Sequence, residues 1–176
     1  MKHPLNFVSE SVRKPLFIAL LIWTLGLFIV FWFLDRPLSP NGIVSFELAR
    51  TPERVSAIMA GWTPLAKLYA ALGLGLDYLF MPSYALTIAL GVLLALKRHG
   101  GWFASLGIWV GWGSLAAALF DAFENIALWE TLAHGVNLTW PQVAFWCASF
   151  KFGLILIGIG FALLGALLPK SVQDAK

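Results

Sequence analysis

Four long apolar segments alternate with short polar ones along the chain. The first runs from residue 16 to residue 34 without a charged side chain, and the others span residues 65–96, 102–133 and 141–168 with few charges. A helix of about 18 or more apolar residues is long enough to cross the hydrocarbon core of a bilayer. The pattern therefore predicts an all-α, polytopic membrane protein built as a bundle of four transmembrane helices.

The loop between the first two apolar segments has its own helical pattern. Thr51 can cap a helix and Pro52 suits its first turn. The apolar side chains that then recur at helical spacing are Val55, Ile58, Met59 and Trp62. We expect a short amphipathic helix at residues 52–60, lying on the outer membrane surface. The alternative is a helix that acts as a lid over a site beneath it.

The composition agrees with a membrane protein. Of the 176 residues, 60% are hydrophobic and 12% are charged, whereas soluble domains carry about 25% charged residues. We expect one membrane domain over residues 1–176. The single cysteine, Cys147, excludes an intramolecular disulfide and a cysteine-rich metal site. The three histidines lie outside the spans, so we expect no metal and no cofactor.

The distribution of charge predicts the orientation in the membrane. The basic residues on the side of the two termini are Lys2, Arg13, Lys14, Lys97, Arg98, Lys170 and Lys176. The other side has four basic residues, Arg36, Arg50, Arg54 and Lys67. Their positive charge is offset by four acids on the same side, Asp35, Glu47, Glu53 and Glu130. The side with more basic residues faces the cytoplasm. Both termini should therefore be cytoplasmic, and the short loops suit a bacterial inner membrane. A net charge of +3 without a basic stripe argues against a nucleic-acid partner.

Ionisable residues interrupt three of the four spans at a similar depth. Asp77, Asp121 and Lys151 each lie about ten residues from the outer end of their span, or roughly 15 Å deep. A charge at the centre of a bilayer costs roughly 2.5 to 3.5 kcal/mol. These side chains should therefore point into the bundle and pair with one another.

Neighbouring polar residues share faces with these charges. Asp121, Glu124 and Asn125 lie on one stripe of the third span, and Asp77 and Tyr84 lie seven residues apart on the second. The predicted ligand-binding residues are Asp77, Tyr84, Asp121, Glu124, Asn125 and Lys151. The candidates for acid/base chemistry are Asp77, Asp121 and Glu124. Three acids share one lysine, so we expect at least one carboxyl group to hold a proton at neutral pH.

The sequence favours a protein that binds or handles a small amphipathic molecule, a lipid or an isoprenoid, with coupling to protonation. No catalytic motif is recognisable, so the sequence leaves open whether the protein is an enzyme. The alternative is an accessory subunit of a larger membrane complex, in which Lys151 forms a structural ion pair with Asp121 or Asp77. Gly107 and Gly111 support this alternative, because small residues four apart allow close helix contacts. The expected partners are membrane lipids, a hydrophobic ligand, and either a second copy or a larger complex.

Overall fold

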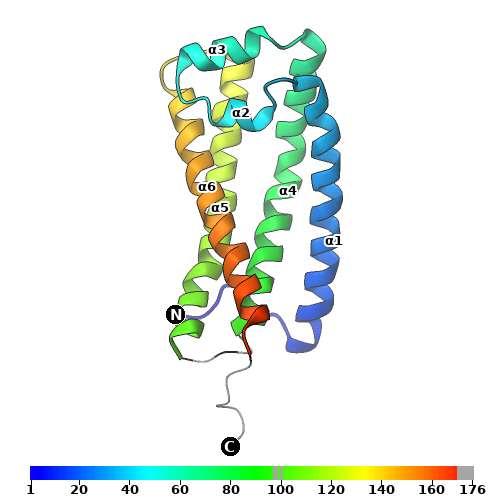
Figure 1. Cartoon of the computed structure of the whole chain (residues 1–176), viewed down its shortest axis with the longest axis vertical. Helices are drawn as coiled ribbons and strands as arrows, with labels where there is room; N and C mark the ends of the chain where they lie inside the picture. The colour runs from blue at the N-terminus through cyan, green and yellow to red at the C-terminus, as the bar shows by residue number, and fades with distance from the viewer. Residues whose placement is uncertain (97–98, 100, 170–176) are drawn as a thin grey trace, which may run out of the picture. The chain divides into compact units, whose positions relative to one another are not determined.

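The computed structural model describes residues 1–96, 99 and 101–169, and these residues form helices joined by short turns. The elements are α1 Glu10–Asp35, a 3-10 helix η1 Arg36–Leu38, α2 Ile43–Glu47, α3 Pro52–Ala60, α4 Pro64–Leu96, α5 Gly101–His134 and α6 Trp140–Leu167 (Figure 1). The described residues contain no strand, which confirms the all-α prediction. Among them, α1, α4, α5 and α6 are long and apolar enough to cross a membrane.

The four predicted apolar segments correspond to these four long helices. Three of them agree with the prediction to within one residue at each end, whereas α1 begins at Glu10 and not at residue 16. The backbone carbonyl of Ser9 accepts hydrogen bonds from Val12 and Arg13, at 3.0 and 3.2 Å, and so begins the helix early. Charged residues can form the first turn of a helix, although they are unsuited to the hydrocarbon core of a bilayer. The helix therefore begins before the apolar segment does.

Lys97, Arg98, Lys170 and Lys176, which support the predicted orientation, lie outside the described residues.

The chain packs into two compact units, and each of the four long helices contributes a segment to both. The first unit comprises the described residues within Met1–Thr24, Pro82–Ala118 and Phe152–Lys176, and the second comprises Leu25–Met81 and Leu119–Lys151. The predicted single domain concerns the chain as a whole and stays a prediction.

The first unit is held together by apolar contacts and by close approach of its helices. Leu5, from the N-terminal segment, packs in one cluster with Leu90 and Leu93 of α4. The rings of Phe103 and Phe161 stack with centroids 4.2 Å apart, which joins α5 to α6.

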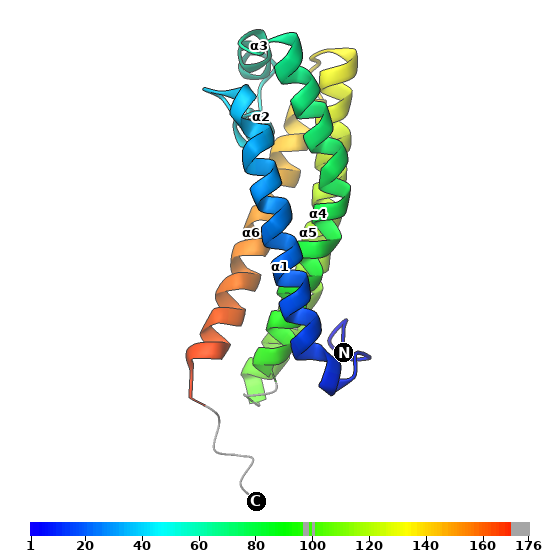
Figure 2. The ribbon, with the colours of Figure 1, turned by 90° about the vertical axis from the view of Figure 1, so that its right-hand side faces the viewer.

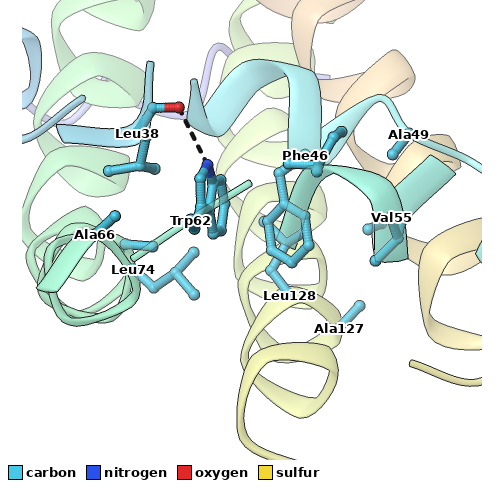
Figure 3. Close-up of a cluster of buried hydrophobic side chains, with 12 residues drawn as sticks. Leu38, Phe46, Ala49, Val55, Trp62, Ala66, Leu74, Ala127 and Leu128 are labelled. Carbon is cyan, nitrogen blue, oxygen red and sulfur yellow. Dashed lines mark hydrogen bonds between the residues drawn. The ribbon is translucent and has the colours of Figure 1, made fainter. Parts of the chain in front are cut away.

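The second unit has an apolar core built around Trp62 (Figure 3). The indole N–H of Trp62 donates to the backbone carbonyls of Leu38 and Asn41, both at 3.1 Å. Phe46 of α2 packs edge-on against the same indole, with ring centroids 5.1 Å apart. In Figures 1 and 2, α3 runs across the ends of the α4, α5 and α6 segments of this unit. The loop between α1 and α4 is therefore folded onto its own unit.

The predicted amphipathic helix is present as α3, with the predicted bounds. Thr51 caps it, because its side-chain oxygen accepts a hydrogen bond from the Arg54 backbone N–H at 3.3 Å. Val55 and Ile58 are only 1% exposed, in the core of the unit. The apolar face of α3 thus packs on the protein itself, and its place on a membrane surface stays a prediction.

The sequence pattern does not predict the short helix α2. This helix begins where the Asp35 carboxylate accepts a hydrogen bond from the Ile43 backbone N–H at 2.6 Å. A side chain at Gly42 would collide with the same carboxylate. Glycine at this turn therefore leaves room for the Asp35 carboxylate that holds the start of α2.

Candidate functional site

The ammonium group of Lys151 is the centre of a buried charged cluster in the second unit. Its Nζ donates hydrogen bonds to Asp121 Oδ1 at 2.9 Å and to Glu124 Oε1 at 2.8 Å. A third carboxyl oxygen, Glu47 Oε2, lies 3.6 Å from the same nitrogen. The side chains of these four residues are 0 to 11% exposed. Charged groups are buried in this way only when they are paired.

The helical repeat explains how two acids of the cluster meet one lysine. Asp121 and Glu124 are three residues apart on α5, so their side chains leave the helix on the same face. Lys151 lies on α6 and reaches this face with its long side chain. Glu47 is the last residue of α2 and approaches from the loop between α1 and α4. Three separate elements therefore supply the cluster.

Asp77 is held next to this group by a different partner. The Asn125 side-chain amide donates to Asp77 Oδ2 at 2.9 Å and to the backbone carbonyl of Leu74 at 3.2 Å. Both amide hydrogens are thereby used to join α5 to α4. Asn125 is 3% exposed, so this polar bridge lies within the unit.

The structure brings together most of the residues that the sequence selects. Asp121, Glu124 and Lys151 are in direct contact, so Glu124 belongs to the same cluster as the other two. Asn125 and Asp77 are joined beside them. Tyr84 is buried in the first unit, and its role as a ligand-binding residue stays a prediction.

Glu47 is the residue of this cluster that the sequence pattern does not select. By sequence it counts only among the acids that dilute the positive charge of the outer side. The available signal is a single acid between Phe46 and Leu48, in a loop segment that is otherwise mostly apolar. A charge in such a segment must either face water or find a buried partner, and the sequence does not reveal which.

The cluster contains more carboxyl groups than its one ammonium can neutralise. If Glu47, Asp121 and Glu124 were all ionised, the charge around Lys151 would be minus two. Burial raises the pKa of the Glu47 carboxyl above its ordinary value, although the nearby Lys151 ammonium acts in the opposite direction. One of the carboxyl groups around Lys151 is therefore suited to hold a proton.

Two carboxyl oxygens show where such a proton fits. Among the described residues, Glu47 Oε2 and Glu124 Oε2 are buried without a hydrogen-bond partner. Both lie near the Lys151 ammonium, at 3.6 and 2.8 Å, and the two carboxyl groups are within hydrogen-bonding reach of each other. Two ionised carboxylates can only accept hydrogen bonds, whereas a protonated one can donate to the other. A proton held by one of these two carboxyl groups could therefore be donated to the other.

Comparisons with protein-family models, curated proteins and solved structures return no match for this chain. The chemistry of the cluster then indicates what the protein can do. Carboxyl groups that share a proton next to a fixed cation can exchange that proton when their surroundings change.

Proposed function

We propose that this chain is an integral membrane protein that binds a small amphipathic molecule, a lipid or an isoprenoid, and couples this binding to proton exchange at the Glu47, Glu124 and Lys151 cluster. The observation that supports the proposal best is the excess of carboxyl groups over ammonium groups, together with two buried carboxyl oxygens that have no hydrogen-bond partner among the described residues.

The membrane setting is supported by the four long apolar helices. In the proposed orientation both termini are cytoplasmic, and the membrane is a bacterial inner membrane. The loop that carries α2 and α3 then lies at the outer face, with α3 at the interface. Glu47 would approach the cluster from that side and so connect it to the exterior.

The stoichiometry of the cluster argues against a purely structural ion pair. One acid is enough to neutralise one lysine, and buried ion pairs add little stability over apolar side chains of similar size. Here three carboxyl groups surround Lys151, and Asp77 lies beside them through Asn125. Intramembrane ionisable groups are expensive, so an excess of them favours a functional role.

If the protein is an enzyme, the same groups supply its chemistry. Asp77, Asp121 and Glu124 are the acid/base candidates, and they suit proton transfer or isomerisation of a bound molecule better than hydrolysis.

The second candidate function is an accessory subunit of a larger complex. Its support in the sequence is the Gly107 and Gly111 pair, which would then be available for a partner helix. A side chain at Gly107 would collide with Leu96 and Phe161, and one at Gly111 would collide with His3. These glycines accommodate contacts within the first unit, so their presence is explained without a partner.

Native mass spectrometry of the protein, extracted gently from its own membrane, tests the proposal. We expect a discrete small mass to co-purify with the wild type and to be absent from Asp121→Asn and Lys151→Ala. Lys67→Ala is the matched control, because Lys67 lies outside the cluster, and it should retain the mass. Thermal unfolding would verify that each variant is folded.

Two results would contradict the proposal. One is a folded Asp121→Asn variant that keeps the same small mass at the same occupancy. The other is a stoichiometric protein partner with no small molecule bound, which would favour the accessory-subunit function.

A further inference from the structure

An open groove lies along the first turns of α6, in the second unit. It has a volume of about 610 Å³ and is lined by Leu138, Thr139, Gln142, Val143, Trp146 and Cys147. Its lining is mostly apolar, with polar groups from Thr139 and Gln142. Sites for small molecules in proteins have volumes of about 300–1,000 Å³, so the groove is large enough to hold part of a lipid chain.

A cationic side chain lies over Trp146, one of the residues that line this groove. The Arg50 guanidinium lies 5.6 Å from the ring centroid of Trp146, which lines the groove, and 5.3 Å from that of Phe145. Attraction between a cation and an aromatic face holds such a group in place. The backbone of Arg50 has a φ of +51°, in the left-handed region that residues other than glycine rarely adopt. The loop is thus held in a costly conformation that places this arginine over α6.

The charge of Arg50 is available for a ligand. Arg50 is exposed, and no ion pair that involves it is seen in the described part of the chain. A guanidinium offers several N–H donors in a plane that matches the oxygens of a phosphate. An apolar groove with a guanidinium over one of its lining residues is complementary to a molecule with an anionic head and a hydrocarbon chain.

We propose that the groove binds an anionic phospholipid, with an acyl chain against Val143 and Trp146 and the phosphate at Arg50. This inference goes beyond the proposed function, because the site contains no member of the carboxyl and lysine cluster. A soluble anion would leave the apolar walls uncovered, and a neutral lipid would leave the guanidinium charge uncompensated. The apolar groove and the guanidinium together therefore favour a lipid that has both a hydrocarbon chain and an anionic head.

The chain provides its own reporter and its own control. Cys147, the single cysteine, lines the groove, so a bound lipid should shield its thiol from alkylation. The Arg36 guanidinium also lies over a tryptophan ring, 3.9 Å from the centroid of Trp32 where Arg50 is 5.6 Å from that of Trp146, but Trp32 does not line the groove. Arg36→Gln is therefore a matched control for Arg50→Gln, because each substitution removes one guanidinium that is stacked on an aromatic ring.

The test measures the rate of Cys147 alkylation by N-ethylmaleimide in neutral detergent as phosphatidylglycerol is added. At a lipid concentration of ten times Kd, occupancy of the site should slow alkylation about tenfold. Arg50→Gln should move the protection curve to at least about tenfold higher lipid concentration, since it removes a charge-assisted interaction with the phosphate. Arg36→Gln should leave the curve unchanged.

Several results would overturn the proposal. They are equal protection by phosphatidylcholine with the same chains, equal protection by inorganic phosphate alone, and equal loss of protection in Arg36→Gln. Should Arg50→Gln fail to fold, salt replaces it as the probe. Protection of the wild type by phosphatidylglycerol must weaken as salt rises, and its independence of salt would also refute the role of Arg50.

The same assay separates this inference from the proposed function. Asp121→Asn should lose the co-purifying small mass and yet keep protection of Cys147 by phosphatidylglycerol. Loss of protection in that variant while it remains folded would mean that the groove is not an independent site, and would contradict the inference.

Discussion

At the level of single residues, the carboxyl group of Glu47 connects the loop between α1 and α4 to the ammonium of Lys151. Its Oε2 atom lies 3.6 Å from Nζ and is buried without a hydrogen-bond partner among the described residues. Burial raises its pKa above the ordinary value of 4.5. The protonation of Glu47 is therefore linked to whether this loop packs against the rest of its unit.

This linkage predicts how stability changes with pH. Between pH 4.5 and the raised pKa, the folded protein holds a proton that the unfolded chain has released. Raising the pH through this range therefore favours unfolding, and the contribution of Glu47 to the free energy of unfolding decreases. Glu47→Gln should remove this part of the pH dependence and be relatively more stable at the alkaline end.

Thermal unfolding in detergent from about pH 4 to pH 8 measures the effect. Glu53→Gln is the control, because Glu53 is an exposed acid in the same loop. Parallel pH profiles for the wild type and Glu47→Gln would contradict a raised pKa of the Glu47 carboxyl group.

The residues of the cluster differ in how far the sequence predicts them. Asp121, Glu124 and Lys151 are predictable because charges inside apolar spans must pair, and the helical repeat shows which acids share a face. Glu47 is not, because its burial depends on the fold of a loop. That fold rests on tertiary contacts, such as those of Phe46 and Trp62, which leave no periodic pattern in the sequence.

At the level of elements, the glycines of α5 show how closely the helices of the first unit pack. A side chain at Gly107 would collide with Leu96 of α4 and Phe161 of α6. Close packing of this kind tolerates little added volume. The pair formed by Gly107 and Gly111 is thus part of the internal packing of this unit.

Gly107→Leu should therefore destabilise the isolated chain. Overpacking typically costs about 1–3 kcal/mol, and we expect a reduced thermal midpoint without the release of any other protein. Gly26→Leu is the matched control on α1, because a side chain there meets open space. Unchanged stability of Gly107→Leu together with loss of a stoichiometric partner would instead identify the glycines as the binding surface for that partner.

Elements are predictable to the extent that their own residues determine them. Four long apolar runs are sufficient to form helices, and a proline and a capping threonine mark the start of α3. The five-residue helix α2 is too short to be stable by itself and forms only because Asp35 and the core of the second unit hold it. Sequence periodicity cannot reveal an element of that kind.

At the level of the whole molecule, four helices that cross a membrane return the chain to the side from which it started. We predict that both termini are cytoplasmic and that the loop with α2 and α3 is exterior. In a Cys147→Ser background, Glu53→Cys should react with a membrane-impermeant thiol reagent added to intact cells. Cysteines attached to either terminus should react only after the cells are opened, and the reverse pattern would contradict the orientation.

The most direct test of the central claim is infrared spectroscopy of the carboxyl groups at neutral pH. The wild type should show the C=O band of a protonated carboxylic acid, and both Glu47→Gln and Glu124→Gln should weaken it, because the proton is shared between these two residues. Glu130→Gln, which lies outside the cluster, should retain the band. Absence of any such band in the wild type across about pH 6 to pH 8 would contradict a shared proton. The cluster would then be a fully ionised group held by Lys151, without the proton exchange that the proposed function requires.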